Sequence, residues 1–436
     1  MFTQLFGKYL VEENVITDED NRALHDKMFK TRVKLGTIAI AEGILDEKQV
    51  EGINHMQTQQ DKRFGDIAIE LAYITEEQLE EMLKKQGSAA LKYYQLLNED
   101  KNIPMEDIDI YIENFQKKFG FNDDELEAIR NDDYDMLISF FAPTRDNLIK
   151  DLSGLVMRNL TRFVSGDFYF GRMKKSADYS YGSIAGQSTS GDCAIYLGFA
   201  AKDESEGIIE LAKGYAKEVA ISSSDEVYDA LCEFTNLNNG LLASELSEHD
   251  EFSDMNPPQV FLGQSIKGTA YVMPIYIHDK QFDMVISTDP DFAPGANAHK
   301  LNIKDTDNRE ETKDAKGRIL VVDDSHLIRK MLGNLLNKNG YAVAGEAANG
   351  QEAVDIYTSL KPDIVTLDVT MPVMDGVEAL KKIKEIDKDA KIIMVTAAGQ
   401  KERIVEAIKA GANAFITKPF DEDDLIKNIN YFKKQS

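Results

Sequence analysis

Arg318-Ile-Leu-Val-Val-Asp323-Asp324 is the stretch that decides the fold of the C-terminal part of this chain. It is a short run rich in β-branched residues that ends in two carboxylates. Later runs end in the same way, with a polar residue that closes an apolar strand: Asp363-Ile-Val-Thr-Leu-Asp368, Ile392-Ile-Met-Val-Thr396 and Ala414-Phe-Ile-Thr-Lys418. Helix-length amphipathic stretches separate these runs. The alternation predicts βαβ units and a parallel sheet.

The polar residues that end these runs predict a phosphoryl-transfer site. Ligands of parallel sheets gather outside the carboxyl ends of the strands, so we expect the five side chains to meet there. Asp323, Asp324 and Asp368 would repel one another without a hard divalent cation, which favours Mg²⁺. With Thr396 and Lys418 beside it, Asp368 is suited to accept a phosphoryl group, because the cation and the ammonium stabilise its charge.

These motifs are the basis of a family resemblance: residues 317–436 resemble a CheY-type receiver domain of bacterial response regulators. The resemblance implies an α/β flavodoxin-like fold, a doubly wound parallel sheet with strand order 2-1-3-4-5. It also implies Asp368 as the phosphoacceptor, Thr396 and Lys418 as phosphoryl-binding residues, and Phe415 as a switch aromatic. A histidine kinase would be the phosphodonor.

Composition limits the other possibilities. At 436 residues the chain has room for two to four domains, and its formal net charge of −26 argues against a nucleic-acid surface. We find no apolar stretch long enough to span a membrane, and the start lacks the pattern of a signal peptide. Two cysteines without metal-ligand spacing are typical of a reducing compartment. We therefore expect a cytoplasmic protein that binds no DNA.

The first 87 residues contain an internal repeat. Phe6-Gly7, Leu35-Gly36 and Phe64-Gly65 recur with a spacing of 29 residues. At matching offsets stand three residues that favour helix N-caps: Thr17, Asp46 and Thr75. Each unit is therefore predicted to be a short helical hairpin that buries its apolar face against its neighbours.

The repeat resembles MshEN-type domains, which bind cyclic di-GMP through tandem motifs. On that resemblance, Lys34 and Arg63 would contact phosphate or guanine. Lys34 stands where the family has an arginine, and a lysine does not offer the same planar fork of donors. A structural, docking or dimerisation bundle is the alternative.

Three further regions complete the organisation. Residues 88–146 have an acidic helical pattern that predicts a connecting segment, and residues 290–316 form a polar linker. The region 147–289 mixes strand-like runs with two helices, which predicts an α+β domain with helices on one sheet face. His249 and His326 are isolated, and we expect both at the surface.

The second helix of the middle region carries its most informative residues. Asp229, Glu233 and Asn236 are spaced so that they share one helix face, and Gly240 continues that face without a side chain. Asn256-Pro257-Pro258 follows downstream. A carboxylate and an amide beside a bare backbone patch suit close approach of another protein.

This set of residues resembles the CheX-type chemotaxis phosphatases, which remove phosphate from receiver aspartates. The resemblance implies that Glu233 pairs with a receiver lysine and that Asn236 orients the attacking water, with Asp229 in support. Two functions follow from this. In the first, the middle domain hydrolyses aspartyl phosphate on its own receiver or on a CheY-like partner. In the second, it is a docking or dimerisation platform gated by phosphorylation.

Overall fold

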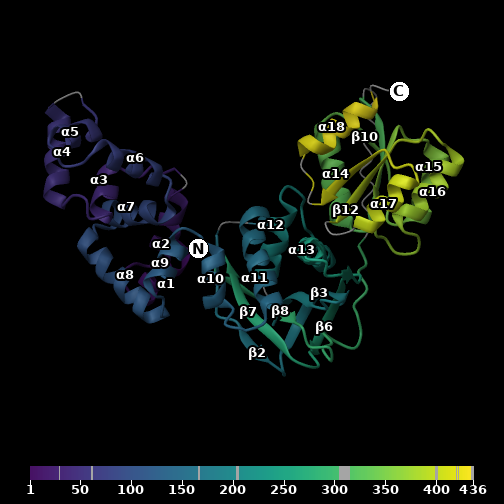
Figure 1. Cartoon of the computed structure of the whole chain (residues 1–436), viewed down its shortest axis with the longest axis horizontal. Helices are drawn as coiled ribbons and strands as arrows, with labels where there is room; N and C mark the ends of the chain where they lie inside the picture. The colour runs from purple at the N-terminus through teal and green to yellow at the C-terminus, as the bar shows by residue number, and fades with distance from the viewer. Residues whose placement is uncertain are drawn as a thin grey trace. The chain divides into compact units, whose positions relative to one another are not determined.

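A computed structural model describes residues 1–28, 30–59, 62–164, 167–202, 206–303, 315–397, 401–418, 420 and 422–433 (Figure 1). The chain divides into two compact units, Met1–Phe140 and Phe141–Ser436. Within the described residues, no helix combines the length and the apolar character needed to cross a bilayer.

All regular secondary structure in the described residues of the first unit is α-helical. Its helices are α1 (Phe2–Glu12), α2 (Asp18–Met28), α3 (Leu35–Ala41), α4 (Glu47–Gln59), α5 (Phe64–Glu70), α6 (Glu76–Lys85), α7 (Ala89–Lys101), α8 (Met105–Phe119), α9 (Asp123–Arg130) and the start of α10 (Tyr134–Phe141). The helices that begin after Thr17, Asp46 and Thr75 each open with reciprocal hydrogen bonds between the cap residue and the residue three positions later. The second helix predicted for each repeat unit is therefore present, and it begins at the predicted cap.

The repeated glycines have a packing reason. A Cβ on Gly36 would lie 2.6 Å from a methyl of Val50, and one on Gly65 would lie 2.7 Å from a methyl of Leu79. Val50 and Leu79 hold the same place in the second helix of their units, so each glycine lets the two helices of a hairpin approach closely. Helix packing thus accounts for the recurrence of glycine without a ligand.

The second unit begins with an antiparallel sheet. After α11 (Asn147–Asn159) and a π-helical turn, η1 (Leu160–Val164), the strands are β1 (Phe168–Phe170), β2 (Lys174–Ser176), β3 (Ser180–Gly191), β4 (Tyr196–Ala201), β5 (Ser253–Met255), β6 (Gln259–Ser265), β7 (Ala270–Ile277) and β8 (Lys280–Ser287). The main path runs β1-β7-β8-β4-β3-β5, with β2 on β7 and β6 on β3. The mixture of helix and sheet predicted for this region is present.

Two helices pack on this sheet. Helix α12 (Glu206–Ala216) contacts β4, β7 and β8, and α13 (Ser224–Glu248) contacts β3, β4 and β6. The start of the expected linker packs on this domain. Ala293 pairs with Lys267 in an isolated β-bridge, and the ring of Phe292 lies 4.7 Å from the ring of Tyr196. Residues 304–314 of the expected linker lie outside the described residues.

The receiver region of the second unit is a parallel sheet between helices (Figure 1). Its elements are β9 (Arg318–Val322), α14 (His326–Lys338), β10 (Ala342–Ala347), α15 (Gly350–Leu360), β11 (Ile364–Asp368), α16 (Gly376–Ile386), β12 (Ile392–Ala397), α17 (Lys401–Lys409), β13 (Ala414–Lys418) and α18 (Glu422–Lys433). The strand order is β10-β9-β11-β12-β13, and each pair is parallel. The predicted order 2-1-3-4-5 is confirmed.

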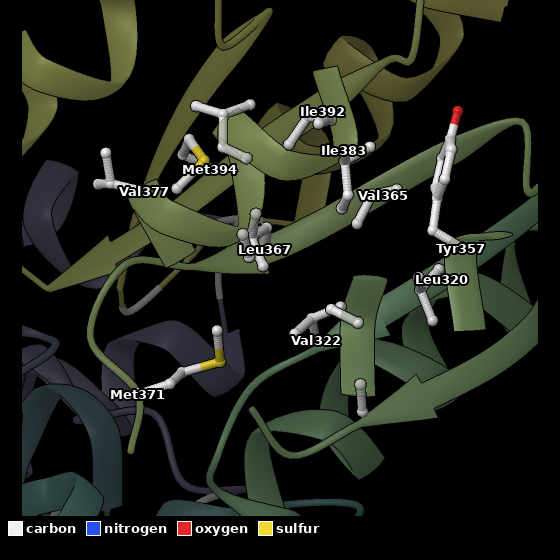
Figure 2. Packing of buried hydrophobic residues seen from close by; sticks show 14 of the residues in the cluster. Leu320, Val322, Tyr357, Val365, Leu367, Met371, Val377, Ile383, Ile392 and Met394 are labelled. Carbon is white, nitrogen blue, oxygen red and sulfur yellow. The ribbon is translucent and has the colours of Figure 1, made fainter. Parts of the chain in front are cut away.

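The receiver core fixes the sheet against its helices. Figure 2 shows Leu367 and Met394 from adjacent strands packed beside Val377 and Ile383 of α16. All four side chains are buried, as are Leu320 and Val322 of β9, so the strands β9, β11 and β12 are anchored by the same core. The polar residues that follow these strands are therefore held at one rigid edge.

Candidate active site

The acidic cluster forms where β9 and β11 end side by side. Asp323 follows β9, and Asp368 is the last residue of β11. The chain turns sharply after Asp368, where a Cβ on Gly376 would lie 1.8 Å from the carbonyl oxygen of Asp368. Only glycine allows α16 to begin so close to the strand end.

One lysine joins the acidic residues. The Nζ atom of Lys418, at the end of β13, lies 2.7 Å from Asp323 Oδ2 and 3.1 Å from Asp368 Oδ1. Backbone amides complete the cluster, because Ser325 N–H donates to Asp323 at 3.1 Å and Thr370 N–H donates to Asp368 at 3.1 Å. The sequence predicted that five side chains would meet at this edge of the sheet. Three of them, Asp323, Asp368 and Lys418, are in direct contact.

The cluster fits a divalent cation. Carboxylate oxygens of Asp323, Asp324 and Asp368 lie within 4.8 Å of one another. Burial raises the pKa of Asp368, and the neighbouring carboxylates raise it further against the opposing effect of Lys418. Burial and Asp323 likewise raise the pKa of Asp324. A hard cation such as Mg²⁺ would relieve this repulsion, and these three residues would hold it.

The remaining receiver positions lie nearby in the fold. Thr396 is buried on β12, one strand from Asp368 in the sheet. Phe415 on β13 is half-buried and packs against the receiver core. Both stand on the strands next to the cluster, where the sequence analysis expects them.

Glu233 and Asn236 of α13 open onto the same cavity as the receiver cluster. The cavity has a volume of about 310 Å³. Its receiver side includes Asp324, Asp368 and Lys418, and its other side includes α13 and Asn256-Pro257-Pro258. Two residue sets predicted separately from the sequence are thus brought to one site.

The charge on Glu233 depends on this site. Burial is the main cause that raises the pKa of Glu233 to about 8. Lys418 lowers the pKa, whereas Asp323 and Asp229 raise it. If a phosphoryl group attracted Lys418 away from Asp323 and Asp368, the ammonium group would stabilise a different set of these carboxylates.

A residue that the sequence analysis missed fixes the orientation of Asn236. Gln187 on β3 donates from Nε2 to Asn236 Oδ1 at 3.0 Å and to the Asn256 carbonyl oxygen at 2.8 Å. Asn239 donates to Gln187 Oε1 at 3.0 Å, which fixes the glutamine in turn. The amide plane of Asn236 is therefore set before any water binds. No motif marks Gln187, since its role depends on how β3 packs on α13.

Asp229 lies on the face that contacts the receiver. Its Oδ2 accepts a hydrogen bond from Leu327 N–H at 2.8 Å and one from Ser325 Oγ at 3.1 Å, at the start of α14. One turn earlier, Glu226 accepts from Lys330 Nζ at 2.7 Å. A buried carboxylate from α13 thus occupies the N-terminus of a receiver helix, where the helix dipole favours negative charge.

In the first unit, Lys34 and Arg63 precede α3 and α5. Lys34 Nζ lies 2.7 Å from Glu99, and a cavity of about 530 Å³ beside it also contains Glu47 and Glu51. Arg63 is not among the described residues that line this cavity. Cyclic di-GMP binding stays a prediction.

Comparison with known proteins places one part of the chain. The response regulator receiver domain family matches residues 319–430. The chemotaxis protein CheY of Thermotoga maritima is 52% identical over 117 residues, which are 27% of this chain and 98% of that protein. The CheY of Bacillus subtilis is 51% identical over 113 residues, 26% of this chain and 94% of that protein.

Two further proteins are each similar to about a quarter of this chain. Sporulation initiation phosphotransferase F of Bacillus subtilis is 44% identical over 108 residues, 25% of this chain and 86% of that protein. Among solved structures, a CheX–CheY–BeF3–Mg complex from Borrelia burgdorferi matches 26% of this chain and 87% of its own at 38% identity, with a TM-score of 0.26. Through residues 319–430, this chain belongs to the response regulator receiver family.

Proposed function

We propose that residues 147–289 form a phosphatase of the CheX type and that its substrate is the aspartyl phosphate on Asp368 of the same chain. One observation carries the proposal: Glu233 and Asn236 line the same cavity as Asp368 and Lys418. A receiver implies a phosphodonor such as a histidine kinase, and an adjacent phosphatase would set how long the phosphoryl group stays.

The contacts between α13 and α14 support the receiver of the same chain as substrate. Asp229 caps α14, and Glu226 pairs with Lys330 of that helix. Both contacts are on the same face of α13 as Glu233, so they set the position of the catalytic pair over the acceptor. A CheY-like partner would have to displace these contacts to reach Glu233.

The chemistry requires positioning more than new reactive groups. Water held by Asn236 would attack phosphorus opposite the bond to Asp368; the new P–O bond forms as that bond breaks, and its electron pair stays on the carboxylate. The products are the Asp368 carboxylate and dihydrogen phosphate, which exchanges protons with solvent. Mg²⁺ would supply charge neutralisation at the transferring group when it is bound.

The residues of this chain have separate roles in that step. Gln187 fixes the amide plane of Asn236, so the water site is preorganised. Lys418 lies 3.1 Å from Asp368 Oδ1 and would stabilise charge on the phosphoryl group. Glu233 opens onto the same cavity, and we assign it the role of fixing Lys418 and the docking register.

A non-catalytic docking role is the second candidate. The hydrogen bonds of Asp229 favour it, because they hold the receiver without involving Asn236. In that case the middle domain would be a platform released or retained by phosphorylation, and the lifetime of the phosphoryl group would not depend on Asn236.

The test compares phosphoryl lifetimes on full chains loaded with acetyl phosphate and Mg²⁺. Asn236→Ala should lengthen the lifetime by roughly 10²- to 10³-fold, by analogy with the loss of a transition-state donor. Glu245→Ala is the matched control, since Glu245 is exposed on the same helix and does not line the cavity. A lifetime that does not change in Asn236→Ala would favour the docking role.

A further inference from the structure

A second cavity meets the first at Lys418. Its volume is about 280 Å³, and it lies between the middle domain and the receiver. Its lining residues come from both: Arg162, Phe163, Tyr215, Lys217, Ile328, Met331, Lys418 and Phe420. We refer to it as the basic cavity and to the cavity that contains Asp368 as the acceptor cavity.

The two cavities have opposite charge. The acceptor cavity has one cation, Lys418, and four carboxylates: Asp229, Glu233, Asp324 and Asp368. The described lining of the basic cavity contains no carboxylate and three cations: Arg162, Lys217 and Lys418. The chain as a whole has a formal charge of −26, whereas the charged residues described in the lining of this cavity are all cations. Such a cavity attracts an anion.

Irregular backbone places the two outer cations of the basic cavity. Arg162 lies in the π-helical turn Leu160–Val164, and Lys217 follows α12 with a left-handed φ of 53°. Gly214 makes room for the turn, because a Cβ there would lie 2.5 Å from a methyl of Val164. Turns of this kind and left-handed non-glycine residues carry a local cost and are concentrated at functional sites.

Tyr215 adds a hydroxyl group to the basic cavity. It lines the basic cavity and is buried, with its ring 5.4 Å from that of Phe234. Burial raises the pKa of Tyr215, and Glu233 raises it further against the opposing effect of Lys418. The phenol has a hydroxyl that can donate to an oxyanion.

We infer that the basic cavity is a binding site for a tetrahedral phosphate oxyanion, held by Arg162, Lys217 and Tyr215. The inference rests on the proposed function for the source of the anion, which is the inorganic phosphate released from Asp368. A second source has the same chemistry: the phosphoryl group of a small phosphodonor that approaches Asp368 past Lys418.

The binding test uses inorganic phosphate and the full-length chain, with the phosphorus NMR signal of phosphate followed as protein is added. Saturable binding is expected, and Arg162→Gln/Lys217→Gln should weaken it by at least about tenfold, since two charged donors are lost. Lys174→Gln/Lys213→Gln removes the same charge from exposed sites that do not line the cavity, and should leave binding unchanged. Arg162→Lys/Lys217→Arg keeps both charges and should retain binding.

No saturable binding to the wild-type chain would overturn the inference, and so would equal binding by the Gln pair and the wild type. Because the measurement involves no turnover, its outcome is independent of whether the phosphatase proposal holds. Two rates then distinguish the sources. If the anion is product, the Gln pair should relieve inhibition of dephosphorylation by added phosphate; if it is a donor, the Gln pair should slow labelling by acetyl phosphate.

Discussion

Asp229→Ala tests the contact that places α13 on the receiver. In the native chain, the Asp229 carboxylate accepts hydrogen bonds from Leu327 N–H at 2.8 Å and Ser325 Oγ at 3.1 Å. Leu327 is the second residue of α14, so its amide has no partner within the helix. Alanine would leave that amide without an acceptor while the two domains stay docked.

Two opposing contributions set the free energy of docking that Asp229→Ala is expected to lose. A buried donor left without a partner costs about 1–3 kcal/mol, and two donors are affected here. Asp229 is buried, so its carboxylate bears a desolvation penalty that raises its pKa and that alanine would remove. We expect a net loss of about 2 kcal/mol, which lowers the ratio of docked to undocked chains by roughly 30-fold.

Hydrogen exchange of the Leu327 amide in the full chain tests the contact, because Asp229→Ala removes the acceptor of this amide and also lowers the docked population. Protection of Leu327 should fall by at least roughly 30-fold in Asp229→Ala. Asp225→Ala is the control, because Asp225 lies on the same helix but pairs with His299 at 2.8 Å. Equal protection of Leu327 in Asp229→Ala and the wild type would refute the assignment of Asp229 as the docking residue.

Three other predictions concern the phosphoacceptor, the pH dependence of docking and the first unit. Asp368→Asn should abolish labelling by acetyl phosphate, and removal of Mg²⁺ with a chelator should do the same to the wild type; persistent labelling of Asp368→Asn, measured by mass spectrometry, would contradict the acceptor assignment. Burial takes the pKa of Glu233 to about 8, so docking takes up a proton at Glu233 and should strengthen as the pH falls from about 8.5 to about 6. Burial raises the pKa of Asp229 as well, which acts in the same direction. Glu226, with a pKa lowered to about 2, contributes no change in that window. The protection of the Leu327 amide in Mg²⁺-free chains, corrected for intrinsic exchange, should therefore rise as the pH falls. A decrease in protection would contradict the predicted direction of the pH dependence. Calorimetry of the full chain with cyclic di-GMP tests Lys34 and Arg63: heat lost in Lys34→Ala/Arg63→Ala would support nucleotide binding, and no heat with the wild type would leave residues 1–87 as a helical bundle.

The receiver was predictable from sequence because its signals are local. Each apolar run ends in the residue that the site uses, and the parallel sheet places those ends together. The caps at Thr17 and Asp46 were predictable for the same reason, since a cap bonds a residue only three positions away.

The interface between the domains was not predictable. Asp229 has the spacing of a supporting catalytic residue, but its partner Ser325 lies 96 positions away and belongs to another domain. Gln187 carries no motif at all, and it acts on Asn236 only through the packing of β3 on α13. The expectation that His326 lies at the surface is wrong, because His326 is buried and its Nε2 lies 3.6 Å from Glu226 of α13.

The lifetime of the phosphoryl group on Asp368, measured in the full chain over a series of dilutions, tests the central claim most directly. Hydrolysis within one chain predicts a short lifetime that does not change with protein concentration. Glu233→Ala/Asn236→Ala should lengthen it by roughly 10²- to 10³-fold at every concentration. Equal lifetimes in the wild type and the double variant would contradict the account, and a lifetime that lengthens on dilution would contradict hydrolysis within one chain.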